Sequence, residues 1–136
     1  MNERNLLQQI GRTGRAMHAA FESEVGIPLP RWRILQALRE SARISQKDLA
    51  SRLSMDPGAL TRQMKQLESE NLVKRRNSEE DNRLTLVELS GKGFALLESL
   101  QEKRLNFSKK ALEGLSEEKI GIAMEILKAM EERFKR

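Results

Sequence analysis

The sequence predicts a mainly helical fold with a small β-hairpin, arranged as a winged helix-turn-helix. Two short helices with clear start signals follow each other at residues 45–52 and 57–70. Two short apolar strands come next, at residues 72–76 and 84–89, and they flank a charged tip at residues 77–83. Two helices joined by a tight turn and followed by a polar hairpin are the element order of modules that place one helix in a DNA major groove.

The two short helices are predicted from their first residues. Ser45 can cap the first helix, and Asp48, three residues later, is the reciprocal partner of a capping box. Asp56 can cap the second helix, and Pro57 occupies its first turn, where the missing N–H costs nothing. We therefore expect two helices that begin sharply and are separated by a short turn.

Helices are also predicted on both sides of this core. Residues 3–24 carry an apolar stripe at helical spacing, and Pro30 suits the first turn of the next helix. Two further amphipathic helices are predicted at residues 91–114 and 117–134. Apolar stripes outside a self-sufficient winged core need a partner, so we expect a homodimer held by the N- and C-terminal helices.

The second capped helix is the candidate reader of DNA. Its first turn carries small residues, which let a helix end approach phosphates and base edges closely. Thr61 can donate to a phosphate or touch a thymine methyl, and Arg62 can bind guanine through two hydrogen bonds. The candidate contact residues on this helix are Gly58, Ala59, Thr61, Arg62, Lys65 and Gln66. The alternative is an ordinary solvated helix face, which the cap before the helix and the hairpin after it disfavour.

The charged tip of the hairpin is the second candidate. A guanidinium at Arg83 could enter a narrow minor groove, where negative potential is concentrated. Asp81 could hold a neighbouring arginine, either Arg75 or Arg83, in a fixed pose, and all three residues are candidates for the DNA-binding site. The alternative is an ordinary exposed ion pair. The acidic pair Glu79-Glu80 repels phosphate and argues against a purely nonspecific wing.

These motifs stand in a specific order along the chain. The matching segments are residues 29–35, 45–50, 56–61, 67–75, 81–83 and 87–93. Together they resemble the MarR family of bacterial transcriptional regulators, and the match is continuous over about residues 29–97. The chain departs from the family at Asn71, where glycine is frequent, and at Leu84, where many members have a second wing arginine. Asparagine tolerates a left-handed backbone, so the turn at residue 71 is expected to survive.

The resemblance implies a triangular homodimer whose two lobes face successive major grooves of a pseudo-palindromic operator. The half-sites would lie about 34 Å apart. The residues that match the family's reading helix are Gly58, Thr61, Arg62, Lys65 and Gln66. Arg83 matches its minor-groove arginine, Asp81 the residue that orients this arginine, and Ser45 the start of the supporting helix. The implied partners are double-stranded DNA and a second copy of the chain, and the implied role is repression.

The resemblance also implies a small effector. Members of the family commonly bind small anionic aromatic molecules between the dimer helices and the winged lobe, and then lose DNA affinity. An imidazole, an indole and a guanidinium could hold an aromatic carboxylate here by stacking and charge. The candidate residues are Arg15, His18, Trp32 and Arg33. The alternative is that Trp32 belongs to the core and that Arg33 is a surface charge.

The composition fits these expectations. We expect a single domain over residues 1–136, with a DNA-binding lobe at residues 30–89 and a dimerisation region at residues 1–29 plus 90–136. The net charge of +5 favours polyanionic partners. The lack of cysteine excludes disulfides and thiolate metal sites. With no apolar run of about 18 residues and no signal-peptide pattern, we expect a cytoplasmic protein without a membrane partner.

Other classes of function receive little support from the sequence. One histidine, no cysteine and no known catalytic motif leave no candidate enzyme site, cofactor site or metal site. A winged helix that binds another protein, without specific DNA binding, remains the alternative function. The salt dependence of binding to random duplex DNA separates the two, because phosphate neutralisation makes affinity fall steeply with salt.

Overall fold

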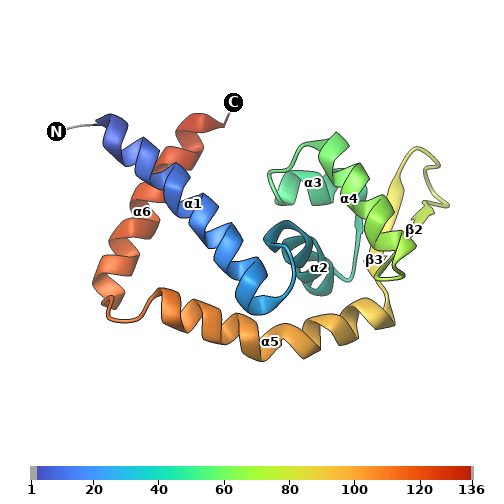
Figure 1. The fold of residues 1–136 in the computed structure, drawn as a ribbon. Coiled ribbons are helices and arrows are strands. Elements are labelled where there is room, and N and C mark those ends of the chain that lie inside the picture. Colours follow the sequence, from blue (N-terminus) through green and yellow to red (C-terminus); the bar gives the residue numbers. More distant parts are fainter. Residues whose placement is uncertain (1–2, 136) are drawn as a thin grey trace. The chain divides into compact units, whose positions relative to one another are not determined.

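The computed structural model describes residues 3–135 and, for side chains, residues 5–135. The elements in chain order are α1 (Glu3–Val25), α2 (Leu29–Ser41), β1 (Arg43–Ser45), α3 (Gln46–Arg52), α4 (Pro57–Ser69), β2 (Val73–Asn77), β3 (Thr85–Leu89), α5 (Gly91–Ala111) and α6 (Glu117–Phe134), as drawn in Figure 1. The expected mainly helical fold with a hairpin after two short helices is confirmed.

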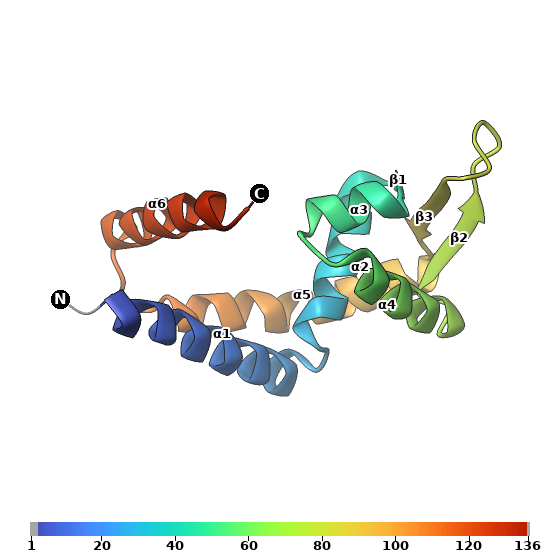
Figure 2. The same ribbon diagram turned by 90° about the horizontal axis from the view of Figure 1, so that it is seen from above.

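The sheet contains one strand more than the sequence predicted. Its three antiparallel strands have the order β1-β3-β2, so β3 lies in the middle. In the central row Val87 of β3 pairs with Ile44 of β1 and with Arg75 of β2. A three-residue strand such as β1 is too short to show an alternating pattern, which explains why the sequence did not predict it. The tip of the β2–β3 hairpin projects away from the helices in Figure 2.

The core of the winged part lies between α2, α3, α4 and one face of the sheet. The side chains with less than 2% exposure come mainly from these elements and include Ile34, Leu35, Leu38, Leu49, Leu60, Met64, Leu67 and Val87. Val73 and Val87 are buried on that sheet face, which we call the inner face. Burial of these side chains is the main force that holds the two helices and the hairpin together.

The chain divides into two compact units, residues 1–104 and residues 105–136. The first contains the winged part, and the second contains the end of α5 together with α6. No residue of α6 is buried. Large apolar side chains are at least 36% exposed in both units, among them Leu6, Leu7, Ile10 and Met17 of α1, and Leu112, Ile122, Ile126, Leu127 and Phe134 of the second unit. No helix in the described part is both long enough and apolar enough to cross a membrane.

The start of α5 is tied to the end of the α4–β2 turn. Asn71 has a φ of 62°, so the asparagine takes up the left-handed backbone that was expected at this position. The Ser90 hydroxyl donates to the Asn71 carbonyl (2.6 Å) and accepts from the Gly93 N–H (3.0 Å). The backbone of α5 passes so close to Leu72, the residue before β2, that a Cβ atom on Gly93 would overlap the Leu72 carbonyl and would lie 2.8 Å from Leu89 Cδ1 of β3.

The close approach at Gly93 predicts a large effect of a single methyl group. Gly93→Ala should lower the free energy of unfolding by about 1–3 kcal/mol, because the backbone at Leu72 cannot move aside easily. Urea denaturation measures this change. Gly91→Ala is the matched control, since a Cβ atom there meets nothing within 4 Å, and it should be close to neutral. Equal stability of the two variants would contradict the packing described here.

Candidate DNA-binding surface

The N-terminal half of α4 is open to solvent and fixed by its cap. Asp56 Oδ2 accepts a hydrogen bond from the Ala59 N–H at 3.0 Å, as the sequence predicted for this cap. Gly58 and Arg62 are exposed, while Ala59 is half-buried. Arg62 Nη1 lies 3.8 Å from the position of a Cβ atom on Gly58, so the guanidinium runs back toward the helix start. One turn further on, Lys65 and Gln66 are also exposed, and the helix presents donors along one side.

Thr61 is engaged within the protein. Its hydroxyl donates to the Pro57 carbonyl at 2.9 Å and accepts from Gln46 Nε2 at 2.9 Å. The one hydroxyl proton is therefore used inside α4, and the side chain is half-buried. The expected donation to a phosphate would require this bond to break. In the structure Thr61 joins α4 to the start of α3, and Gln46, which the sequence analysis did not select, is its partner.

Ser45 occupies the junction of β1 and α3. Its Oγ accepts from the Asp48 N–H at 3.0 Å, which is the cap expected from the sequence. The same residue pairs with Leu86 in the sheet. Ser45 thus fixes the start of the supporting helix relative to the hairpin.

The tip of the hairpin is ordered by two side chains. Asp81 Oδ1 accepts from both the backbone N–H and Nε of Arg83, at 3.0 and 3.2 Å. Ser78, which the sequence analysis did not select, is buried, and its Oγ accepts from the backbone N–H groups of Glu80 and Asp81. The Arg83 side chain is 91% exposed. Of the two arginines that Asp81 could have held, the structure places Arg83 against it.

Arg75 lies on the inner face of the sheet. Its Nε and Nη2 donate to Glu68 Oε1 of α4, at 3.1 and 2.9 Å, and its side chain is 22% exposed. Strand alternation puts Arg75 on the same side as the buried Val73. Arg75, a candidate for DNA contact, links the hairpin to α4 in the structure.

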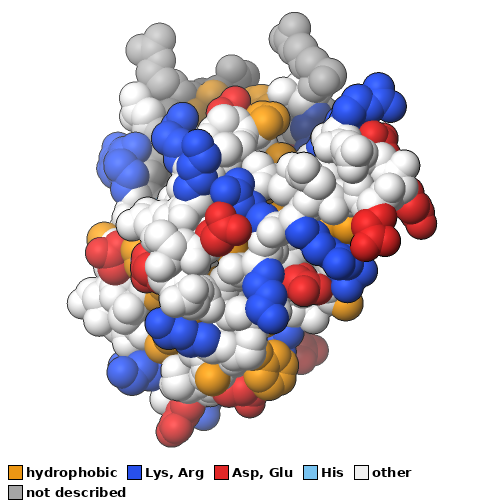
Figure 3. Space-filling model, turned by 90° about the vertical axis from the view of Figure 1, so that its right-hand side faces the viewer, with side chains coloured by type: hydrophobic (Ala, Val, Ile, Leu, Met, Phe, Trp, Pro, Cys, Tyr) orange, Lys and Arg blue, Asp and Glu red, His pale blue; other side chains and the backbone are white. Residues whose placement is uncertain are grey.

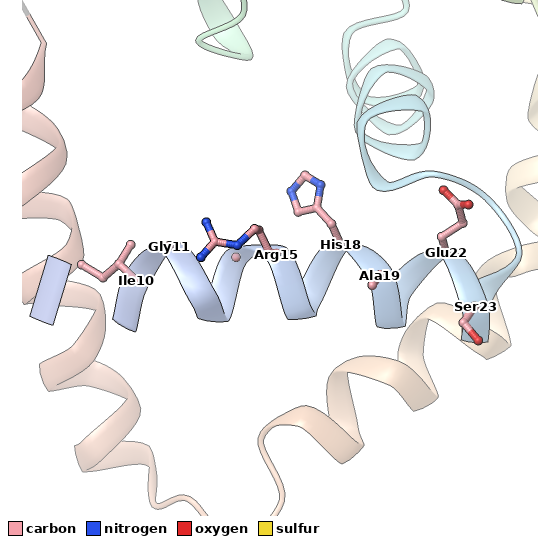
Figure 4. Close-up of a pocket in the computed structure, with 8 residues that line it drawn as sticks. Ile10, Gly11, Arg15, His18, Ala19, Glu22 and Ser23 are labelled. Carbon is pink, nitrogen blue, oxygen red and sulfur yellow. The ribbon is translucent and has the colours of Figure 1, made fainter. Parts of the chain in front are cut away.

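The four candidate ligand residues do not line a common cavity. Arg15 and His18 line an open groove that belongs to α1 alone, together with Ile10, Gly11, Gly14, Ala19, Glu22 and Ser23. In Figure 4 the side chains of Arg15, His18 and Glu22 extend from one side of this helix. Arg33 is exposed and does not line this groove. A groove built from one helix needs a second element to enclose a ligand.

Trp32 does not line the α1 groove but lies on α2, next to α5. Its ring packs against Phe21, with 5.7 Å between the ring centroids, and the Arg104 guanidinium stacks over it at 5.5 Å. It also lines a small cavity between α2 and α5, together with Gln36, Arg39, Leu97, Gln101 and Arg104. The indole is half-buried, so it has both a packing role and a face toward this cavity.

Two capped helices in tandem, an exposed second helix and a hairpin with an ordered arginine define a DNA-binding winged helix-turn-helix protein. The sequence model of the MarR family matches residues 27–85. The uncharacterised HTH-type transcriptional regulator YdgJ of Bacillus subtilis is 35% identical over 128 residues, which are 94% of this chain and 78% of that protein. The chain therefore belongs to the MarR family and is a transcriptional regulator.

Solved structures of the same family share the fold. A single-residue mutant of MarR from E. coli, complexed with operator DNA, superposes with a TM-score of 0.83 at 23% identity, over 96% of this chain and 99% of that chain. BpsR of Bordetella bronchiseptica, solved in work on the regulation of its DNA binding by 6-hydroxynicotinic acid, gives a TM-score of 0.83 at 19% identity, over 93% and 98% of the two chains.

The double hydrogen bond of Thr61 leads to a prediction about stability. Thr61→Val keeps the shape of the side chain and removes both bonds, so the free energy of unfolding should fall by about 1 kcal/mol. Thr61→Ser keeps the hydroxyl and should retain most of that stability. Urea denaturation of the two variants measures the difference. An unchanged midpoint for Thr61→Val would show that the hydroxyl does not support the fold.

Proposed function

We propose that the protein is a cytoplasmic repressor that binds a pseudo-palindromic operator as a homodimer and is released by a small aromatic acid. The observation that carries the proposal is the combination of an exposed α4 start with an Arg83 guanidinium held by Asp81. In this proposal residues 30–89 form the DNA-binding lobe, and residues 1–29 plus 90–136 form the dimerisation region.

The exposed side of α4 supports sequence reading in a major groove. A guanidinium such as that of Arg62 can donate two hydrogen bonds to the O6 and N7 atoms of guanine. Lys65 and Gln66 lie one turn further along the same exposed side and suit phosphate or adenine. The small Gly58 at the helix start lets the backbone N–H groups approach a phosphate.

The hairpin tip supports a second contact in the minor groove. Ser78 and Asp81 fix the backbone and the guanidinium before DNA arrives, so less conformational entropy is lost on binding. An exposed ion pair such as Asp81–Arg83 is worth only about 0–1 kcal/mol, and the negative potential of a narrow minor groove can compete with it. Arg83 is thus oriented by its partner without being buried by it.

The exposed apolar side chains support the homodimer. Leu6, Ile10 and Met17 lie on α1, and Ile122 and Leu127 lie on α6, each at least 36% exposed. Exposure of apolar surface to water is unfavourable by about 25 cal/mol per Å². A second copy of the chain would cover these side chains and remove that cost. A two-fold dimer would present two α4 helices to half-sites about one helical turn apart.

The groove along α1 supports release by a small aromatic acid. Arg15 offers a cation and His18 an aromatic ring, and the groove is lined by one helix only, so we infer that the partner copy encloses the ligand. A ligand that binds better to a lobe spacing unsuited to DNA lowers DNA affinity by its differential binding. The DNA binding of BpsR is regulated by 6-hydroxynicotinic acid, which makes this acid a suitable probe.

The wing contact is tested with DNA selected from random sequences. Arg83→Ala should weaken binding of the selected duplex by about 10- to 100-fold, as expected for the loss of one groove contact. Arg33→Ala, which removes an exposed charge from α2, is the matched control and should keep the affinity within about two-fold. Fluorescence anisotropy measures both. Unchanged binding of Arg83→Ala would remove the wing from the mechanism, and a monomer in light scattering at micromolar concentration would contradict the homodimer.

Release by ligand is tested by titrating the complex of the protein and selected DNA with 6-hydroxynicotinic acid and with benzoic acid. Arg15→Gln should raise the concentration needed for half release by about ten-fold, since one charge-assisted hydrogen bond is lost. Arg12→Gln removes the same charge from the same helix but outside the groove, and it should behave like the unmodified protein. Loss of release in Arg104→Gln instead would place the acid in the α2–α5 cavity.

A further inference from the structure

The sheet has a second face, which points away from α4. It carries basic side chains that belong neither to α4 nor to the hairpin tip. We call it the outer sheet face and define it by Arg43, Lys74, Arg76, Leu86 and Glu88. These residues line a shallow depression on the sheet. Figure 3 shows the molecule from the side on which the hairpin lies, and basic and acidic side chains are interspersed there.

The strand register brings these side chains together. In one row Glu88 of β3 lies between Arg43 of β1 and Lys74 of β2, and in the next row Leu86 pairs with Arg76. Paired residues in antiparallel strands point to the same side, so all five side chains share one face. Lys74 and Arg76 are two residues apart on one strand, which places their Cα atoms about 6.7 Å apart. That spacing is comparable with the distance between neighbouring phosphates on one DNA strand.

Most of the positive charge on this face is not compensated. Arg43 Nε lies 3.5 Å from Glu88 Oε2, and that exposed pair uses the one acidic group of the face. Lys74 and Arg76 are exposed and form no ion pair within residues 5–135. Arg75, between them in sequence, turns to the inner face and pairs with Glu68. Because side chains of β2 alternate between the two faces, the ion-paired Arg75 lies on the inner face, and Lys74 and Arg76 lie on the outer sheet face.

We propose that the outer sheet face binds the phosphate backbone of duplex DNA that flanks the operator. The inner face is covered by α4, with Arg75 bound to Glu68, so the outer face lies on the opposite side of the hairpin from the reading helix. The hairpin whose tip carries Arg83 also carries Lys74 and Arg76, so the face is continuous with the proposed wing contact. The contact is electrostatic and reads no base sequence.

Flanking DNA fits this face better than an apolar partner does. Leu86 is its only large apolar side chain among the five that define it, and it is half-buried between strands. Two free cations per protomer would give four phosphate contacts per dimer, in addition to those of α4 and the wing. The inference rests on the proposed operator binding but concerns DNA outside the operator, so the two can fail separately.

The experiment compares two duplexes that contain the same selected operator. The short duplex ends at the base pairs that the wings reach, and the long duplex extends it by about one helical turn, roughly 10 base pairs, at each end. The unmodified protein should bind the long duplex about ten-fold more tightly at moderate salt. The double variant Lys74→Gln/Arg76→Gln should lose this advantage and keep its affinity for the short duplex. On the long duplex, the plot of log affinity against log salt should be less steep for this variant than for the unmodified protein, by about 3 to 4 in the slope.

The matched control is Lys103→Gln/Lys128→Gln, which removes the same charge from exposed positions on α5 and α6 and should keep the length advantage. The single variant Arg76→Gln should lose part of the advantage and guards against a folding defect of the double variant. Equal losses on both duplexes, no loss on either, or no length advantage of the unmodified protein would each overturn the proposal. A protein that binds neither duplex specifically would instead contradict the proposed function.

Discussion

The arrangement of the DNA-binding elements depends on one hydroxyl group, that of Ser90. It donates to the carbonyl of Asn71 at the end of the α4–β2 turn and accepts from the N–H of Gly93 in the first turn of α5. The Ser90 N–H donates to the carbonyl of Leu72 at 3.1 Å, and Lys92 Nζ donates to the Glu70 carbonyl at 3.0 Å. The reading helix, the hairpin and the long helix therefore meet at one joint, where Gly93 leaves no space for a side chain.

This joint explains how a signal in the helical region could reach the DNA contacts. Any displacement of α5 relative to the sheet has to shift the end of α4 or break the hydrogen bonds of Ser90. Close-packed joints of this kind transmit small movements because they deform little. On the DNA side, the Gln46–Thr61 and Arg75–Glu68 bonds tie α4 to α3 and to β2. We therefore expect α4 to move together with α3 and β2, so that the proposed ligand would act by changing the position of the whole lobe rather than of single side chains.

The sequence predicted the features that local chemistry determines. The caps at Ser45 and Asp56 and the left-handed turn at Asn71 depend on a few neighbouring residues, and the structure shows all three. The roles of Thr61 and Arg75 were not predictable in this way. Which face of α4 or β2 a side chain occupies depends on the register of packing, and both residues turned out to lie next to partners from other elements.

The elements and residues that the sequence analysis did not predict also depend mostly on contacts between distant parts of the chain. β1 is recognisable only through its pairing with β3, and Gln46 matters only because α3 lies beside α4. Ser78 is an exception with a local signal, since a serine two and three residues before backbone N–H groups can accept from both, as it does in this tip. For the candidate ligand residues, spacing along α1 placed Arg15 and His18 together, but nothing in the chain order indicated that Trp32 faces α5 instead.

Some of the cations behind the net charge of +5 are paired within the protein. Arg31, Arg39, Arg52 and Arg75 are each engaged with a glutamate of another element. Arg62, Lys65, Lys74 and Arg76 form no ion pair within residues 5–135, and they lie on the reading helix or the hairpin. Because nonspecific affinity grows with the number of phosphates that are neutralised, internal pairing of Arg31, Arg39, Arg52 and Arg75 limits it. The acidic Glu79 and Glu80 at the hairpin tip act in the same direction, so a larger share of the binding energy has to come from contacts that read base sequence and groove shape.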